Sequence, residues 1–158
     1  MSTYEEFANA FIVNSSFAGK ALTVQGSGKV QQVMEKSTVS ATAATGTVQF
    51  DALTQAVVYY TSNATANWTL NIRGNASVSL NSIMATGESL TVTFLVTQGS
   101  TAYYNNAFTI DGTSVTPKWQ SGIAPNAGNI NSVDSYTYAI IKTGDAAFTV
   151  IASQTRYA

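Results

Sequence analysis

The stretch from Ser89 to Gln98 reads Ser-Leu-Thr-Val-Thr-Phe-Leu-Val-Thr-Gln, and it decides the fold class. Apolar residues occupy every second position, and threonines fill most of the positions between them. Alternation of this kind, built from β-branched and aromatic residues, is typical of a strand with one face in a core. Leu95 makes the second face partly apolar too. We therefore predict that this strand lies inside a sheet and not at its edge.

From Ser37 onward the chain repeats this pattern of short alternating runs separated by Gly, Asn and Asp. Asp111-Gly112 favours a type I′ hairpin turn, and Gly144-Asp145 is predicted to turn a second hairpin. Residues 82–88 are predicted to form one helical turn that ends at Gly87. About eight strands with turn signals between them predict an all-β fold, an antiparallel β-sandwich or jelly roll. The other predicted strands are 47–51, 56–61, 67–73, 102–110, 135–143 and 146–154.

Residues 1–36 differ from this pattern, and we predict that they form a short helical or extended arm before a β domain at 37–158. Thr3 and Glu6 have the spacing of a capping box, which favours a short helix after them. The apolar side chains of the arm need a partner. Either they pack on the chain's own β domain, or they dock on a neighbouring subunit or scaffold. These candidate docking residues are Tyr4, Phe7, Phe11, Ile12 and Phe17.

The composition is unusually poor in charge. The 158 residues suit one domain plus an arm, and they are 45% hydrophobic but only 9% charged, against about 25% in an ordinary soluble domain. Such a surface is typical of stable extracellular β proteins and of assemblies in which much of the surface is covered. The net charge of −1 gives no long-range field to attract nucleic acid or an anionic membrane, so we expect neither as a partner.

The sequence contains neither histidine nor cysteine. This excludes Ser-His-Asp and Cys-His catalysis, thiolate metal sites and disulfides. Most of the eight acidic residues lie in predicted turns, so a pair of catalytic carboxylates is not expected. We predict that the protein is not an enzyme and holds no metal or cofactor. The first residues lack the features of a secretory signal, and no run reaches the ~18 apolar residues of a spanning helix.

Lys118, Trp119 and Gln120 form the candidate ligand-facing patch, because they lie beside a predicted loop at 122–132 that is rich in Gly, Asn and Ala. An exposed indole can stack on a sugar ring, and the neighbouring polar groups can hydrogen-bond to its hydroxyls. The alternative is that Trp119 packs against aromatic residues of neighbouring strands.

Several longer strings of the chain resemble a small β domain of virion structural proteins from tailed phages that infect marine cyanobacteria. The resemblance spans residues 33–158. The strings that carry it are Leu53-Thr54-Gln55, Tyr59-Tyr60-Thr61-Ser62-Asn63-Ala64, Phe94-Leu95-Val96-Thr97-Gln98-Gly99, Ala102-Tyr103-Tyr104-Asn105-Asn106, Val115-Thr116-Pro117-Lys118-Trp119-Gln120 and Phe148-Thr149-Val150-Ile151-Ala152-Ser153-Gln154-Thr155.

The resemblance implies a virion structural protein, displayed on the particle as a capsid decoration or as a short tail or fibre appendage. Its expected partners are further copies of itself, as a homo-oligomer and specifically a trimer, and other virion proteins of the capsid or tail. Contacts of the β domain and of the N-terminal arm would hold the oligomer together. The alternative is a receptor-binding module of a tail fibre that recognises host surface glycans. No catalytic residues come with the resemblance.

Overall fold

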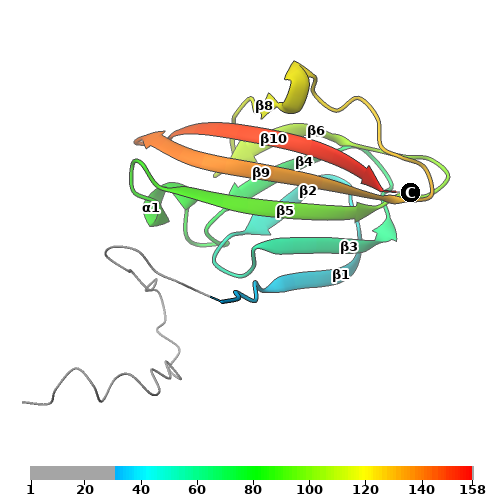
Figure 1. Cartoon of the computed structure of the whole chain (residues 1–158), viewed down its shortest axis with the longest axis horizontal. Coiled ribbons are helices and arrows are strands. Elements are labelled where there is room, and N and C mark those ends of the chain that lie inside the picture. The colour runs from blue at the N-terminus through cyan, green and yellow to red at the C-terminus, as the bar shows by residue number, and fades with distance from the viewer. Residues whose placement is uncertain (1–30, 158) are drawn as a thin grey trace, which may run out of the picture. The chain divides into compact units, whose positions relative to one another are not determined.

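The computed structural model describes residues 31–157, most of which lie in strands (Figure 1). From Met34 onward they belong to one compact unit. Residues 31–36 are exposed and form neither helix nor strand. The predicted helix near the start of the chain lies outside the described residues. So do the five candidate docking residues, Tyr4, Phe7, Phe11, Ile12 and Phe17.

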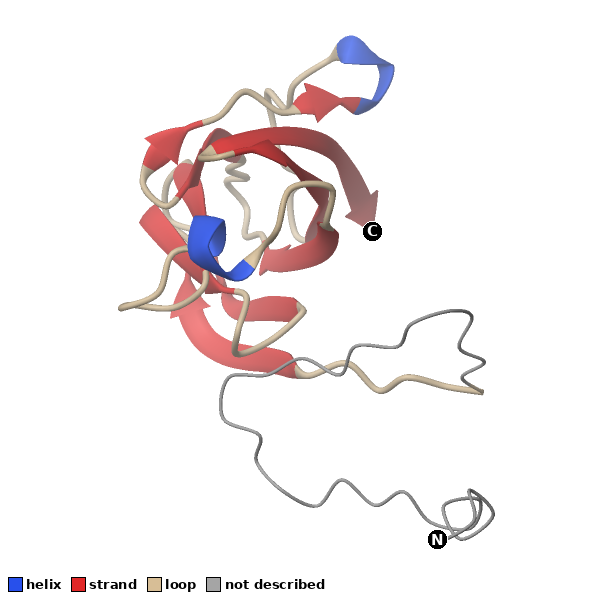
Figure 2. Cartoon of the chain, turned by 90° about the vertical axis from the view of Figure 1, so that its left-hand side faces the viewer, coloured by secondary structure: helices blue, strands red, loops and turns tan. Residues whose placement is uncertain are grey.

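The strands form two sheets that face each other, as Figures 1 and 2 show from two directions. The six-stranded sheet has the order β1 (Ser37–Ala43), β3 (Val57–Asn63), β5 (Ser89–Thr97), β9 (Val133–Gly144), β10 (Ala147–Tyr157) and β8 (Lys118–Trp119). The four-stranded sheet has the order β2 (Gly46–Asp51), β4 (Trp68–Arg73), β6 (Asn105–Ile110) and β7 (Thr113–Ser114). The short helix α1 (Leu80–Ile83) and the 3-10 turn η2 (Gln120–Gly122) complete the described elements. The all-β prediction is confirmed.

The pairing of the strands corrects the prediction of an antiparallel sandwich or jelly roll. The strands β1 to β6 alternate between the two sheets, so that β1 pairs with β3, β3 with β5, β2 with β4 and β4 with β6, all in parallel. Antiparallel pairing is confined to β5–β9, β9–β10 and β6–β7, and the two-residue β8 joins β10 in parallel. Period-two alternation marks which residues face the core, and it is the same for both pairing directions. The crossover that parallel strands require is supplied here by a strand of the opposite sheet.

Strand β5 occupies the position that its sequence predicts. It lies between β3 and β9, with Val92, Phe94 and Val96 buried on its inner face and Leu95 half-buried on its outer face. An apolar residue on the outer face is tolerated because neighbouring strands flank it on both sides. The prediction of an interior strand is confirmed.

Aromatic side chains join the two sheets across the core. Trp68 of β4 is fully buried and meets Phe94 of β5 and Tyr136 of β9 edge to face, at ring-centroid distances of 5.9 and 5.5 Å. Phe108 of β6 stacks on Tyr138 of β9 at 4.7 Å. Such pairs contribute about 0.5–1.5 kcal/mol each beyond the area that they bury. The interior therefore depends on large rings from both sheets.

The Asp111-Gly112 turn between β6 and β7 also holds the short helix. Both residues have positive φ, 52° and 79°, as a type I′ turn requires, so the hairpin prediction is confirmed. The Asp111 carboxylate accepts the backbone N–H groups of Leu80 and Asn81 at 2.6 and 2.9 Å. These contacts begin the helical turn at Leu80, earlier than the predicted start at residue 82, and it ends before Gly87.

We expect Asp111→Ala to lower the free energy of unfolding by about 1–2 kcal/mol, because α1 loses two acceptors and a residue with no side-chain acceptor enters the left-handed region. Asp111→Asn is the matched control, since asparagine tolerates this backbone and keeps one acceptor oxygen. Urea unfolding of both variants measures the difference. Unchanged stability in both variants would show that the hydrogen bonds to α1 contribute nothing to stability.

Candidate functional site

The structure brings the three predicted ligand-facing residues together along one open hollow of about 450 Å³, beside residues of β9 and β10. Lys118 is exposed and pairs in register with Ile151 of β10, on the outward side of the six-stranded sheet. Trp119 is half-buried and meets Tyr138 edge to face at 5.8 Å, so the aromatic-packing alternative describes part of its role. Trp119 and the exposed Gln120 both line a cleft that Lys118 does not reach.

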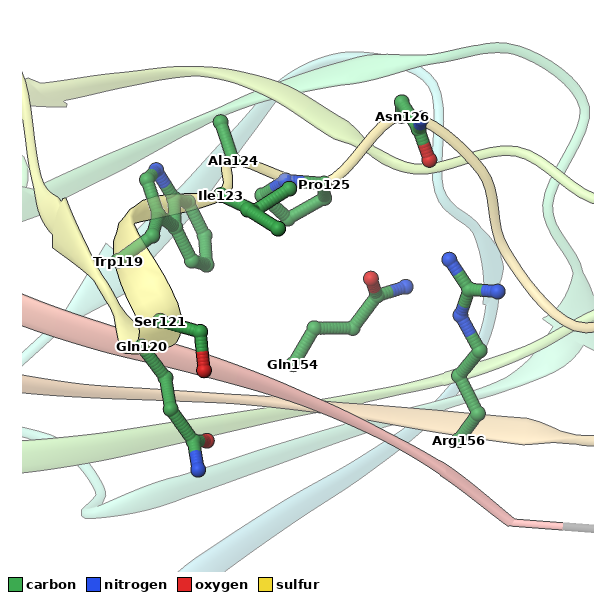
Figure 3. A pocket seen from close by; sticks show the side chains of 9 residues that line it. All are labelled: Trp119, Gln120, Ser121, Ile123, Ala124, Pro125, Asn126, Gln154 and Arg156. Carbon is green, nitrogen blue, oxygen red and sulfur yellow. The ribbon is translucent and has the colours of Figure 1, made fainter.

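The cleft has a volume of about 250 Å³ and lies between β10 and the segment that follows β8. In Figure 3, Gln154 and Arg156 rise from β10 on one side, and Trp119 lies at one end. The predicted loop at 122–132 forms much of the opposite wall. The complete lining is Trp119, Gln120, Ser121, Ile123, Ala124, Pro125, Asn126, Gln154 and Arg156.

The far half of this loop is fixed by hydrogen bonds to β10. The backbone carbonyl of Ala127 accepts hydrogen bonds from Gln154 Nε2 at 3.0 Å and from Arg156 Nη2 at 2.9 Å. Gly128 follows, and a Cβ there would come within 2.7 Å of Gln98 Nε2 and 2.8 Å of Asp134 Oδ2. Only a glycine fits such a close approach. The cleft wall is therefore held in place before any ligand arrives.

Asp134 of β9 fixes the same loop from beneath. The residue is fully buried, and its Oδ2 accepts Gln98 Nε2 at 3.0 Å and the backbone N–H of Asn129 at 3.1 Å. Oδ1 has no hydrogen-bond partner among the described residues. Burial raises the pKa of this carboxyl above its usual range, opposed by the Asn129 and Gln98 hydrogen bonds and by the Arg156 charge. The predicted strand at 135–143 begins too late, because Asp134 lies within β9.

Tyr136 connects the cleft to the core. Its hydroxyl accepts Gln154 Nε2 at 2.9 Å and the backbone N–H of Asn105 at 3.4 Å. Burial, and after it the Asp134 charge, raises the pKa of this phenol far above its usual range, so the hydroxyl stays protonated. Gln154 Nε2 thus bonds to both the loop and the core, which leaves Gln154 Oε1 as the acceptor available to the cleft.

Gln154 and Arg156 are candidate binding residues of the cleft that the sequence did not point to. A signal for them exists, because period two places residues 154 and 156 on the same face of β10 as the buried Val150 and Ala152. Where the residues on the inner face of a strand change from apolar to polar, the strand extends beyond the core. The arrangement offers an indole, several amides, a hydroxyl and a guanidinium, which suits the binding of a polar ligand.

Within residues 31–157 no group of three or more acidic side chains is placed to hold a metal ion. No helix in the same range has the length and apolar character needed to cross a membrane. Compared with protein-family models, with curated proteins and with solved structures, the chain matches none. The site is therefore interpreted from its own geometry.

We expect Asp134→Asn to change the pH dependence of stability. Because the pKa of Asp134 is raised in the folded protein, the folded state binds its proton more tightly than the unfolded state does. The stability that this proton provides is full below the unfolded pKa of about 3.9 and is lost as pH rises through the higher folded value. Relative to the variant, the wild-type protein should lose stability as pH rises above about 4.

Denaturant unfolding of both proteins between acidic and neutral pH measures this difference. Glu88→Gln is a matched control, since it removes an acidic group outside the cleft, one that accepts the backbone N–H of Ala85. Parallel pH profiles for the wild type and Asp134→Asn would contradict the prediction.

Proposed function

We propose that the chain is a virion structural protein, displayed on the particle surface as a capsid decoration or short appendage, that assembles into a homo-oligomer. The proposal rests on the side of the six-stranded sheet that points away from the four-stranded sheet, here called the outer face. Its residues alternate with the buried ones along β3, β5, β9 and β10, and register aligns them in rows. Two of these rows are Val57, Thr93, Thr137 and Ser153, and Tyr59, Leu95, Ser135 and Thr155.

The outer face carries no charge across its central strands. Among residues 31–157, the charged side chain in register with it is Lys118, on the two-residue edge strand β8. Arg73 pairs with Asp51 at 2.6 Å on the other sheet, and Lys142 and Asp134 are buried. A second copy that packs against the central strands of this face therefore meets no like charge there and removes no charged group of these strands from water.

The size of the outer face fits an interface between copies. Its four strands, about 4.8 Å apart and each rising about 3.3 Å per residue, give a face of roughly 600 Å². A standard interface takes about 800 Å² from each partner. The outer face with its rim therefore has the area of a stable contact, and a symmetric oligomer buries it without exposing a new surface. The resemblance to phage virion domains supports a threefold arrangement and a place on the particle.

We expect Thr93→Arg to convert the oligomer to a monomer, because it places a charge at the centre of the outer face, beside Thr137 at an Oγ1–Oγ1 distance of 3.5 Å. Thr113→Arg on the exposed hairpin strand β7 is the matched control and should leave the assembly intact. Light scattering coupled to size-exclusion chromatography gives the mass, and circular dichroism verifies that both variants fold. A monomeric wild-type protein, or an oligomeric Thr93→Arg variant, would exclude this interface.

The virion role has its own measurement. Quantitative mass spectrometry of purified particles should find this chain as a stoichiometric component relative to the major capsid protein. A copy number near that of the capsid subunit would identify a decoration protein, and a far lower number would identify a tail or fibre appendage. Absence of the chain from the particles would refute the proposal.

A second candidate function is the recognition of a host surface glycan, which the cleft favours. Trp119, the amides of Gln120 and Asn126 and the guanidinium of Arg156 converge on a space of about 250 Å³. This candidate is compatible with a structural role, since a displayed protein can also bind a host.

A further inference from the structure

We propose that the cleft binds a carbohydrate with a carboxylate group, such as a uronic acid, through Arg156, with the sugar ring against Trp119. This inference rests on the second candidate function and names its ligand class. The positions of the two side chains suggest it: in Figure 3 the indole and the guanidinium face the same space from different walls.

Arg156 is the charged residue of the cleft lining, and no acidic side chain in the described range lies within ion-pair distance of it. One of its nitrogens, Nη2, donates to the Ala127 carbonyl at 2.9 Å. The ion pair within residues 31–157 joins Arg73 to Asp51, and Arg156 takes part in none. Asp134 is its neighbour in register on β9 and the two charges attract each other, but the hydrogen bonds that this carboxylate accepts come from Gln98 and Asn129. The remaining guanidinium N–H groups can therefore receive an external anion.

A carboxylate fits this guanidinium better than a neutral hydroxyl does. The planar guanidinium presents parallel N–H groups that match the two oxygens of a carboxylate, and the bonds are charge-assisted. The single bond to Ala127 fixes the orientation of the group, so little side-chain entropy is lost when a ligand binds. Arg156 supplies the positive charge of the lining, so the cleft is matched to one carboxylate of the ligand.

The rest of the cleft suits the ring of a sugar and not an apolar ligand. A ring's C–H groups can lie against the negative face of the Trp119 indole. Gln120, Asn126 and the Gln154 Oε1 atom supply donors and acceptors for ring hydroxyls.

The backbone of the cleft wall carries strain at the position that faces this space. Ser121 has φ 59° and ψ 13°, the left-handed region that a non-glycine residue seldom adopts. Gly122 follows with φ 71°. Holding such a residue costs of order 1 kcal/mol, and strain of this kind clusters at binding sites. It turns Ser121 into the lining and supplies a further hydroxyl.

The test is a titration followed through the two indole N–H resonances in nitrogen-15 NMR spectra. The probes are the disaccharide of galacturonic acid and the neutral disaccharide of galactose. We expect the acidic disaccharide to shift the Trp119 resonance at millimolar concentration and to leave that of Trp68, which is fully buried, in place. We expect its affinity to exceed that of the neutral disaccharide about tenfold and to fall with added salt.

Arg156→Gln should reduce the affinity for the acidic disaccharide to that for the neutral one. Lys118→Gln is the matched control, because it removes a neighbouring positive charge that does not line the cleft, and it should keep the preference. An unchanged Trp68 resonance verifies that each variant is folded.

Two results would overturn the inference and leave glycan recognition standing. One is equal affinity of the wild-type protein for both disaccharides, and the other is loss of the acidic preference in Lys118→Gln as well as in Arg156→Gln. If neither disaccharide shifts the Trp119 resonance, the cleft does not bind these sugars, and the inference fails together with the second candidate function.

Discussion

The contact between Trp68 and Tyr136 is the interaction on which both the core and the cleft depend. Trp68 comes from the four-stranded sheet and Tyr136 from the six-stranded sheet, so their edge-to-face contact holds the two sheets together. The Tyr136 hydroxyl then accepts Gln154, whose amide also holds the loop at Ala127. A ring that packs in the core thereby positions a polar group at the surface. The geometry of the cleft follows from the packing of the interior, because one side chain takes part in both.

The sequence predicted the strands well and their pairing badly. Alternation identified β5 with its inner and outer faces, and Asp111-Gly112 identified the β6–β7 hairpin. Both are local signals, because they depend on residues within one strand or one turn. The parallel pairing of β1 with β3 and of β2 with β4 joins residues that are about twenty positions apart, and no local pattern records which strand becomes the neighbour. Antiparallel pairing was predicted because it is the commoner pairing direction. In this fold, however, the chain passes through the opposite sheet between neighbouring strands, which makes them parallel.

The site was predicted in part for the same reason. Trp119 and Gln120 stand beside a loop in the sequence, and that proximity persists in the cleft. Gln154 and Arg156 reach the cleft from a different strand, and the register of β10 places them there. Lys118 shares an open hollow with Trp119 and Gln120, as their adjacency in the sequence predicts, but it does not line the cleft. The predicted strand at 135–143 left Asp134 out, whereas in the structure the hydrogen bonds that it accepts from Gln98 and Asn129 allow it to be buried within β9.

The alternation of β1 to β6 between the two sheets also bears on how the chain folds. Nearly every parallel contact closes a long loop of chain, so we expect a high contact order and folding in the range of milliseconds to seconds. The hairpin β9–β10 is the long local element, and it comes last in the described chain. It pairs with β5 and brings Tyr136 to Trp68. During synthesis the earlier strands therefore emerge from the ribosome before the element that completes their sheet, and their apolar inner faces await it. The six-stranded sheet can therefore be completed only after the hairpin β9–β10 has been synthesised.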